Sequence, residues 1–165
     1  MSADADPDEV ARLIVLRQLT QGPRTRAQLA EACAKRSVPP QVSDRVLDRF
    51  TELGLIDDVS FAQAWVQSRH AGKGLSRKAL RFELRRRGVA DDVIDGALEQ
   101  VGGDDERAAA TALVRSRVAG LARYDRATQT RRLQGLLARR GYSAGLAAAV
   151  VREVLGDPVG QDVWP

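Results

Sequence analysis

A dense group of basic side chains is the most distinctive chemical feature of the sequence. Residues 77–87 contain six basic residues and one acid, Glu83, and their leucine spacing predicts a helix. The basic residues are Arg77, Lys78, Arg81, Arg85, Arg86 and Arg87. Such groups bind phosphates and carboxylates, while like charges at helical spacing destabilise an isolated helix. The pattern therefore predicts a binding face for an anionic partner. Alternatively, the face is solvated and pairs with Asp91, Asp92 and Asp95.

A second group of basic residues lies further along the chain. Residues 107–152 contain ten arginines and a single acid, Asp125. The arginines that we expect on its binding surface are Arg123, Arg126, Arg131, Arg132, Arg139 and Arg140. We expect the first two in a loop and the others on or next to a helix. This surface suits phosphate or an acidic protein groove, and charge alone does not choose between them.

Side chains that could catalyse a reaction or bind a metal are scarce. His70 is the only histidine, Cys33 is the only cysteine, and no zinc-binding spacing accompanies them. The glycines of residues 72–76 lack the spacing of a phosphate-binding loop, so we expect an ordinary loop there. Pairs of aspartates at residues 57–58, 91–92 and 104–105 occur where helices should begin, and capping explains them. We therefore predict that the protein is not an enzyme and needs no metal or cofactor.

The composition agrees with a helical protein that binds an anion. Of 165 residues, 44% are hydrophobic and only 4% aromatic, which favours a core of small aliphatic side chains between helices. The formal net charge is +4, which favours an anionic partner. No segment has the length of a membrane span, the start is acidic rather than signal-like, and one cysteine makes no internal disulfide. We expect a cytoplasmic monomer that does not bind membranes.

The elements that carry these side chains recur along the chain. Residues 26–50 align without a gap on residues 77–101 at an offset of 51, and residues 130–154 align on the same segment at an offset of 53. Leu29, Leu80 and Leu133 fall at one shared apolar position, and Cys33 is placed at another, opposite Leu84. Each copy predicts three helices, so the chain should be an all-helical, elongated row of three repeats that resemble helix-turn-helix units.

The repeats predict the domain boundaries. We expect an acidic tail over 1–8, repeats over 9–56, 57–102 and 103–155, and a C-terminal tail over 156–165 in which Trp164 is exposed or a docking anchor. In the second repeat the first helix should span 60–69 after an aspartate cap, with Trp65 in the core and a loop over 70–75. Ser76 should cap the next helix and Gly88 should end it. The third repeat should begin after a loop and cap over 101–106 and contain extra loop residues over 122–128.

One stretch resembles a known family. Residues 54–89 resemble the central motif of the RecX regulatory proteins, in which Gly-apolar-apolar-Asp-Asp precedes two aromatic positions, a glycine-bearing loop and a basic helix that ends in a glycine turn. The matching residues are Gly54, Leu55, Ile56, Asp57, Asp58, Phe61, Ala62, Trp65, Val66, Arg69, Gly74, Leu80, Glu83, Leu84, Arg87, Gly88 and Val89. The segment 136–143 is similar to the third-repeat signature of that family. The resemblance covers about residues 10–155.

The resemblance implies a function without catalysis. RecX proteins are elongated rows of three-helix repeats that bind filaments of the RecA recombinase on DNA. They inhibit its ATPase, strand exchange and co-protease activities, which restrains recombination, DNA repair and the SOS response, and some also bind DNA. No cofactor is implied. The first copy departs from the pattern at residues 37–40, so the resemblance supports partner contacts least over residues 24–50.

A direct DNA-binding regulator with tandem helix-turn-helix units is the competing hypothesis. The arginine content and the basic charge favour it. No copy, however, carries an evident set of base-reading side chains at a helix start. On either hypothesis, single- or double-stranded DNA is a partner, and under the first it binds more weakly than the recombinase does.

Overall fold

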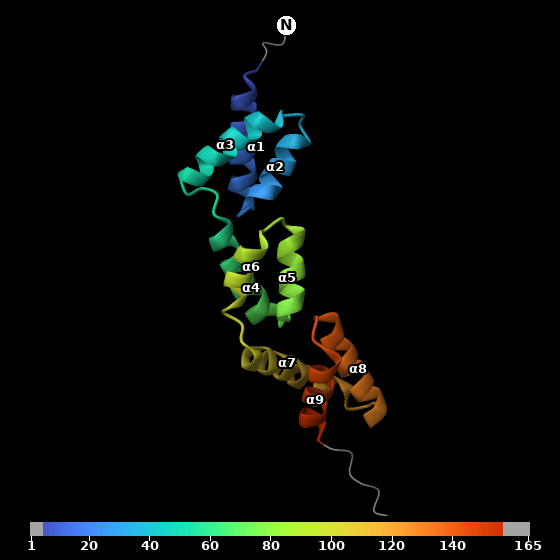
Figure 1. Cartoon of the computed structure of the whole chain (residues 1–165). Helices are drawn as coiled ribbons and strands as arrows, with labels where there is room; N and C mark the ends of the chain where they lie inside the picture. Colours follow the sequence, from blue (N-terminus) through green and yellow to red (C-terminus); the bar gives the residue numbers. More distant parts are fainter. Residues whose placement is uncertain (1–4, 157–165) are drawn as a thin grey trace, which may run out of the picture. The chain divides into compact units, whose positions relative to one another are not determined.

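The computed structural model describes residues 5–156, and the regular structure of that part of the chain is entirely helical (Figure 1), as predicted. The α-helices are α1 (Pro7–Gln21), α2 (Arg26–Ala34), α3 (Pro40–Glu52), α4 (Asp58–Lys73), α5 (Arg77–Arg86), α6 (Asp91–Leu98), α7 (Gly103–Val118), α8 (Arg126–Arg139) and α9 (Ala144–Leu155). A short 3-10 helix, η1 (Ala119–Leu121), follows α7. The C-terminal residues 157–165, Trp164 included, lie outside the described part of the chain.

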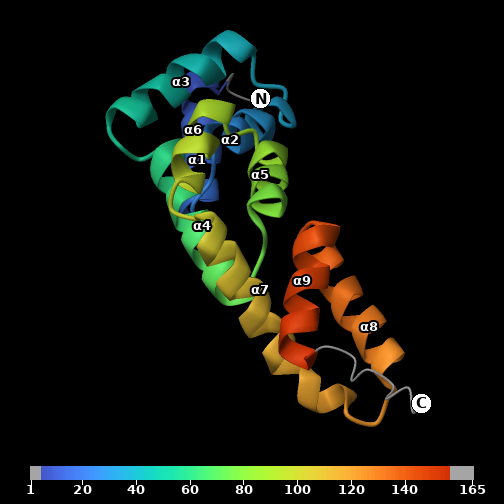
Figure 2. The same cartoon turned by 60° about the horizontal axis from the view of Figure 1, so that its bottom comes forward.

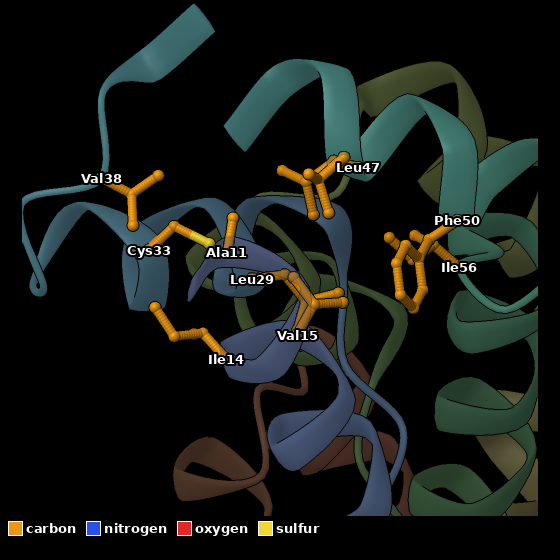
Figure 3. Close-up of a cluster of buried hydrophobic side chains, with 10 residues drawn as sticks. Ala11, Ile14, Val15, Leu29, Cys33, Val38, Leu47, Phe50 and Ile56 are labelled. Carbon is orange, nitrogen blue, oxygen red and sulfur yellow. The ribbon is translucent and has the colours of Figure 1, made fainter. Parts of the chain in front are cut away.

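The first three helices pack on one another around an aliphatic core. Ala11 and Val15 of α1 meet Leu29 and Cys33 of α2 and Leu47 of α3 in this core (Figure 3). These side chains have no exposed surface, so the inward positions read from the helical spacing are confirmed, including that of Cys33. Burial also raises the pKa of the Cys33 thiol, which keeps it protonated and unreactive.

The last three helices form a second core of the same kind. Helices α7, α8 and α9 pack on one another, and α8 and α9 lie side by side in both views (Figure 1 and Figure 2). The fully or nearly buried side chains of this core are Ala110, Val114, Leu133, Leu137, Tyr142, Ala147, Val150 and Val151. Leu133 and Leu137 occupy the positions that the sequence repeat assigned to them.

The chain divides into two compact units, and the division falls inside the middle group of helices. The first unit contains the residues up to Val66 together with Arg81–Glu99. The second contains Gln67–Leu80 together with the residues from Gln100 onward. Each unit therefore holds one complete three-helix group and part of α4 and α5, and the units differ from the repeats that the sequence predicts.

The turn after the second helix of each group has one backbone pattern. The amide N–H groups of Val38, Val89 and Tyr142 donate to the carbonyls of Cys33, Leu84 and Leu137, at 3.1–3.2 Å. The residue before each donor has a positive φ: 60° at Ser37, 76° at Gly88 and 88° at Gly141. Gly88 therefore ends α5 in the left-handed conformation that was predicted.

In the first unit, the turn at Gly88 packs against the start of α2. The Thr25 hydroxyl donates to the Arg87 carbonyl at 2.6 Å, and the Arg26 amide donates to the Asp58 carboxylate at 3.0 Å. A Cβ on Gly88 would lie 2.3 Å from the Cβ of Ala27. Glycine is thus required here by close packing as well as by φ.

In the second unit, the turn at Gly141 makes the equivalent contact with the start of α5. The Ser76 amide donates to the Arg140 carbonyl at 3.0 Å, and the Arg77 amide donates to the Glu106 carboxylate at 2.7 Å. A Cβ on Gly141 would lie 2.4 Å from the Ser76 hydroxyl oxygen. Within each unit, a glycine turn and a carboxylate of one group therefore contact the start of the second helix of the preceding group, and the carboxylate accepts from its first amide.

Several predicted caps are confirmed. Thr25 and Gln28 form a capping box at the start of α2, and Pro40 begins α3. Asp57 accepts from the Ser60 amide at 3.0 Å, and Ser76 accepts from the Ala79 amide at 3.1 Å. Each side chain satisfies a backbone N–H that has no partner within its helix.

Other helix boundaries were predicted incorrectly, because helices begin earlier or extend further than expected. Helix α1 begins at Pro7, inside the predicted tail, because the Asp6 carboxylate accepts from the Asp8 amide and proline suits a first turn. Helix α4 continues to Lys73, through most of the predicted loop. Gly74, with φ +61°, follows it, and His70 contacts the Leu75 carbonyl at 2.9 Å through Nδ1.

The third group shows the same kind of difference. Helix α7 begins at Gly103, so the acids of residues 104–106 form its first turn rather than a loop. Arg126 begins α8, where a loop was predicted, because Asp125 caps the helix by accepting from the Thr128 amide at 2.8 Å. The extra residues predicted over 122–128 therefore form the turn that follows η1 and the beginning of α8.

Candidate partner and nucleic-acid interface

Two of the predicted arginines on α5 pair with acids of the next helix. Arg81 contacts Asp95 at 2.7 Å, and Arg85 contacts Asp91 at 2.7 Å. The hydrogen bond and the attraction between Arg85 and Asp91 raise the pKa of the guanidinium and lower that of the carboxyl. For Arg81 and Arg85, the alternative of a face neutralised by nearby aspartates therefore holds. Both pairs are partly exposed, so each contributes little to stability.

An exposed aromatic ring lies among these cations. Phe82 is 62% exposed, the largest exposure among the large hydrophobic side chains of the described residues. The Arg86 guanidinium lies over its ring, 5.8 Å from the centroid. The sequence prediction did not include Phe82 among the site residues. An aromatic residue between arginines on an outer helix face was the signal that could have identified it.

Arg87 makes an aromatic contact and a backbone contact. Its guanidinium lies 3.8 Å from the centroid of the Trp65 ring and donates to the Glu83 carbonyl at 3.0 Å. The Trp65 indole N–H donates to the Glu83 carboxylate at 2.8 Å, and Phe61 stacks on Trp65 at 5.8 Å. Trp65 was predicted to lie in the core, but it is only half-buried, and the Arg87 guanidinium covers one face of its ring.

Arg77, Lys78 and Arg140 lie in the second unit. Arg77 and Lys78 line a cavity of about 310 Å³ with Glu106 and Tyr142, and Lys78 is exposed. The Arg140 guanidinium donates to the Lys73 carbonyl, and the Tyr142 hydroxyl donates to the Gly74 carbonyl at 2.6 Å. Burial raises the pKa of Tyr142 to about 12, so its hydroxyl stays protonated. Arg140 and Tyr142 thus bind the loop that precedes α5.

Two of the remaining predicted arginines contact a tyrosine. The guanidiniums of Arg132 and Arg123 lie 4.1 Å and 4.8 Å from the centroid of the Tyr124 ring. Arg123 also donates to the Tyr124 hydroxyl at 2.7 Å. We call Arg123, Tyr124 and Arg132 the Tyr124 cluster. The structure thus brings together two arginines that are nine residues apart in the sequence.

The other arginines of this group lie on α8. Arg126 donates to the carbonyl of Gly156, and Arg131 and Arg139 are exposed. Five predicted arginines lie on α8 or in the turn before it: Arg123, Arg126, Arg131, Arg132 and Arg139. Between residues 5 and 156, no carboxylate forms an ion pair with any of these five arginines. We call these five residues with Tyr124 the α8 surface, and Arg81, Phe82, Arg85 and Arg86 the α5 surface.

The described residues contain no group of three or more histidine, cysteine, aspartate or glutamate side chains that could hold a metal ion. None of their helices is both long enough and apolar enough to cross a membrane. Together, the fold and the two surfaces define a class: a helical-repeat protein with arginine-rich surfaces.

Comparison with known proteins narrows this class to one family. The family description "RecX, second three-helix domain" matches residues 57–98, and "RecX, first three-helix domain" matches residues 11–50. The Regulatory protein RecX of Thermobifida fusca (strain YX) is 53% identical over 145 residues, covering 88% of this chain and 78% of the relative. That of Streptomyces coelicolor (strain ATCC BAA-471 / A3(2) / M145) is 51% identical over 150 residues, covering 91% and 80%. The chain belongs to the RecX family.

Solved structures share the fold. A crystal structure of RecX from Lactobacillus salivarius matches with a TM-score of 0.78 at 15% identity, covering 90% of this chain and 97% of that chain. A second crystal structure, of a regulatory protein RecX, matches with a TM-score of 0.74 at 20% identity, covering 88% and 71%. At these identities the likeness concerns the fold, and it agrees with the all-helical repeat architecture read from the sequence.

Proposed function

We propose that the protein binds the nucleoprotein filament of the RecA recombinase and inhibits its ATP hydrolysis, strand exchange and co-protease activity. By this action it would restrain recombination, DNA repair and the SOS response in the cytoplasm. Membership of the RecX family supports the proposal, since the relatives carry the name of regulatory proteins. The proposal assigns the chain no catalytic step and no cofactor. Its modules would be the three repeats over 9–56, 57–102 and 103–155.

The exposed Phe82 on the α5 surface is the observation that carries this proposal. A phenylalanine that is 62% exposed leaves a large apolar area in water. Aromatic and arginine side chains are the residues most enriched at the centres of protein interfaces, where a few of them supply most of the binding energy. A protein groove that covers Phe82 and offers carboxylates to Arg85 and Arg86 would match this surface.

The two ion pairs of α5 are consistent with a protein partner. Arg81 and Arg85 keep their orientation through Asp95 and Asp91, so little side-chain freedom remains to be lost on binding. The same aspartates repel phosphate. This surface therefore suits a protein with both apolar and acidic groups better than it suits a bare polyanion.

The test measures single-stranded-DNA-dependent ATP hydrolysis by RecA at physiological salt, with substoichiometric amounts of this protein. We expect inhibition by the wild-type protein, and we expect Phe82→Ala to need about tenfold more protein for the same effect, because an interface anchor typically contributes about 1–2 kcal/mol. Leu13→Ala is the matched control, because Leu13 is 59% exposed on α1 and lies outside the α5 surface. No inhibition by the wild-type protein would overturn the proposal. If Phe82→Ala and Leu13→Ala inhibit equally well, Phe82 does not contact the filament.

Direct DNA binding is a second candidate function, and the α8 surface favours it. Its arginines form no close ion pair with a carboxylate of residues 5–156, and Arg131 is attracted to Asp125 only at longer range. A protein that bound only phosphate would lose affinity by orders of magnitude between about 50 and 200 mM salt. A filament binder anchored by Phe82 would lose much less, so salt dependence separates the two functions.

A further inference from the structure

The α8 surface is built on a segment that has no counterpart in the second repeat. At the offset of 53, Ser76, which caps α5, aligns with Gln129, yet Gln129 lies inside α8 rather than at its start. Helix α8 therefore begins about one turn earlier than α5 does. The helix η1 and the turn that follows it lead into this additional turn, and they carry Arg123 and Tyr124.

This segment is held in one conformation by its own hydrogen bonds. The Gln129 side chain donates to the carbonyls of Leu121 and Tyr124, both at 3.0 Å. The Tyr124 amide donates to the Leu121 carbonyl at 3.0 Å, and Asp125 caps the helix. Hydrogen bonds to Thr128 lower the pKa of Asp125, so this cap stays ionised at neutral pH. The arginines are thus presented from an ordered scaffold, which lowers the entropic cost of binding a ligand.

The Tyr124 cluster orients two guanidiniums without neutralising them. A guanidinium over an aromatic ring is held by the ring electrons but keeps its positive charge and leaves N–H groups at its edge for other partners. The ring is itself occupied, because Arg132 and Arg123 contact it and Arg123 bonds its hydroxyl. Tyr124 is therefore a support for cations rather than a platform for an incoming base.

The surroundings of the cluster favour phosphate over a protein. Its arginines form no ion pair with a carboxylate of residues 5–156. Among the described residues, every exposed large hydrophobic side chain lies outside residues 119–139, so the α8 surface has no exposed apolar anchor of this kind. Protein interfaces rely on such anchors, whereas contacts with a nucleic-acid backbone rely on unpaired cations.

We propose that the Tyr124 cluster, together with Arg126 and Arg131, binds the phosphate groups of a DNA backbone. This assignment rests on the proposed function, because the α8 surface would contact the DNA of the filament and the α5 surface would contact its protein. Several guanidiniums fixed along one helix and its preceding turn would contact successive phosphates. The binding would be independent of base sequence.

The experiment measures binding of a fluorescently labelled oligothymidine strand by anisotropy at several salt concentrations. We expect the double variant Arg123→Gln/Arg132→Gln to bind about tenfold more weakly at low salt and to have a shallower salt dependence, by about 0.7 per lost contact. Tyr124→Leu keeps the charge but releases the guanidiniums, so it should weaken binding less and leave the salt slope unchanged. Arg115→Gln is the control, because Arg115 is an exposed arginine of α7 in the same unit. Circular dichroism checks that each variant is folded.

Inhibition of RecA by the same proteins distinguishes this assignment from the proposed function. If the double variant loses DNA affinity while Arg115→Gln does not, the assignment is supported whether or not RecA is inhibited. If the double variant binds DNA like the wild type but no longer inhibits RecA, the α8 surface contacts protein and the phosphate assignment is wrong. Unchanged DNA binding with unchanged inhibition overturns it as well, and so does a wild-type protein that binds no DNA. Failure of the proposed function shows instead as wild-type protein that does not inhibit RecA.

Discussion

The α5 surface and the α8 surface are both rich in arginine, but they offer different chemistry. On α5, Arg81 and Arg85 pair with acids of α6, and Phe82 is exposed between cations. On α8, the arginines form no close ion pair with a carboxylate of the described residues, and the aromatic ring lies under two guanidiniums. The difference teaches that the neighbours of an arginine, more than its presence, decide whether a surface suits a protein or a phosphate backbone.

Both surfaces depend on the glycine turns that end their helices, and breaking these turns should have the largest effect. We expect Gly88→Ala and Gly141→Ala each to lower the free energy of unfolding by about 2–4 kcal/mol, because a left-handed alanine is strained and its Cβ would overlap Ala27 or Ser76. Thermal or urea unfolding measures the change. Gly54→Ala is the matched control, because φ there is +75° but nothing lies within 4 Å of the added Cβ, and it should cost about 1 kcal/mol. Equal losses for all three variants would mean that the packing of the turns contributes nothing.

Removing the acids of α6 should make the α5 surface resemble the α8 surface. We expect Asp91→Asn/Asp95→Asn to raise the affinity for single-stranded DNA several-fold at low salt and to steepen its salt dependence, because Arg81 and Arg85 become available to phosphate. Stability should change little, since the pairs are partly exposed.

The control for this experiment is Asp44→Asn/Glu99→Gln, which makes the same change in charge at exposed acids of the same unit. If the control raises DNA affinity equally, net charge rather than the pairing of α5 explains the difference between the two surfaces.

The smallest expected effect concerns pH, and it separates an ion pair from a helix cap. The pKa values of Asp91 and Asp125 are both lowered from the ordinary value of 3.8, so each carboxylate stabilises the folded state fully above that value and loses this contribution as the pH falls through its folded pKa. A hydrogen bond from Arg85 is the main cause for Asp91, whereas hydrogen bonds from Thr128 are the main cause for Asp125.

Titration of the side-chain carboxyl carbons by NMR at low and high salt measures both values. Salt should weaken the shift of Asp91, which includes attraction to Arg85 and Arg81, more than that of Asp125. Equal salt sensitivity would show that the two carboxylates are held in the same way.

Much of the fold could be predicted because helical spacing records which side of a helix is buried. Leu29, Leu80 and Leu133 share one position in the repeat, and all three are buried. Helix ends were predicted well where a local side chain caps them, as at Asp57 and Ser76. The extensions of α4 and α8 were missed, because a helix continues through weakly favourable residues when its surroundings support it, and those surroundings are not local in sequence.

The candidate site was predicted less completely. Spacing placed Arg81 and Arg85 together on an outer face, but it left open whether Asp91 and Asp95 would pair with them. The exposure of Phe82 depends on how the other helices pack around α5. The stacking of Arg87 on Trp65 joins residues of two different helices. Both features therefore depend on tertiary packing. The family resemblance came from residues that build the turns and caps, such as Gly88 and Asp58, rather than from the surfaces.

The sequence by itself determined the helices, their buried faces, the repeat and the family, because these depend on periodicity, capping and glycine positions that neighbouring residues set locally. The tertiary structure decided how each arginine is used. Whether a guanidinium is neutralised by an acid, held against a ring or turned to solvent depends on side chains that packing brings from elsewhere in the chain. The Tyr124 cluster and the paired arginines of α5 both lie in arginine-rich segments of the sequence. Only packing gave the first an aromatic neighbour and the second acidic neighbours.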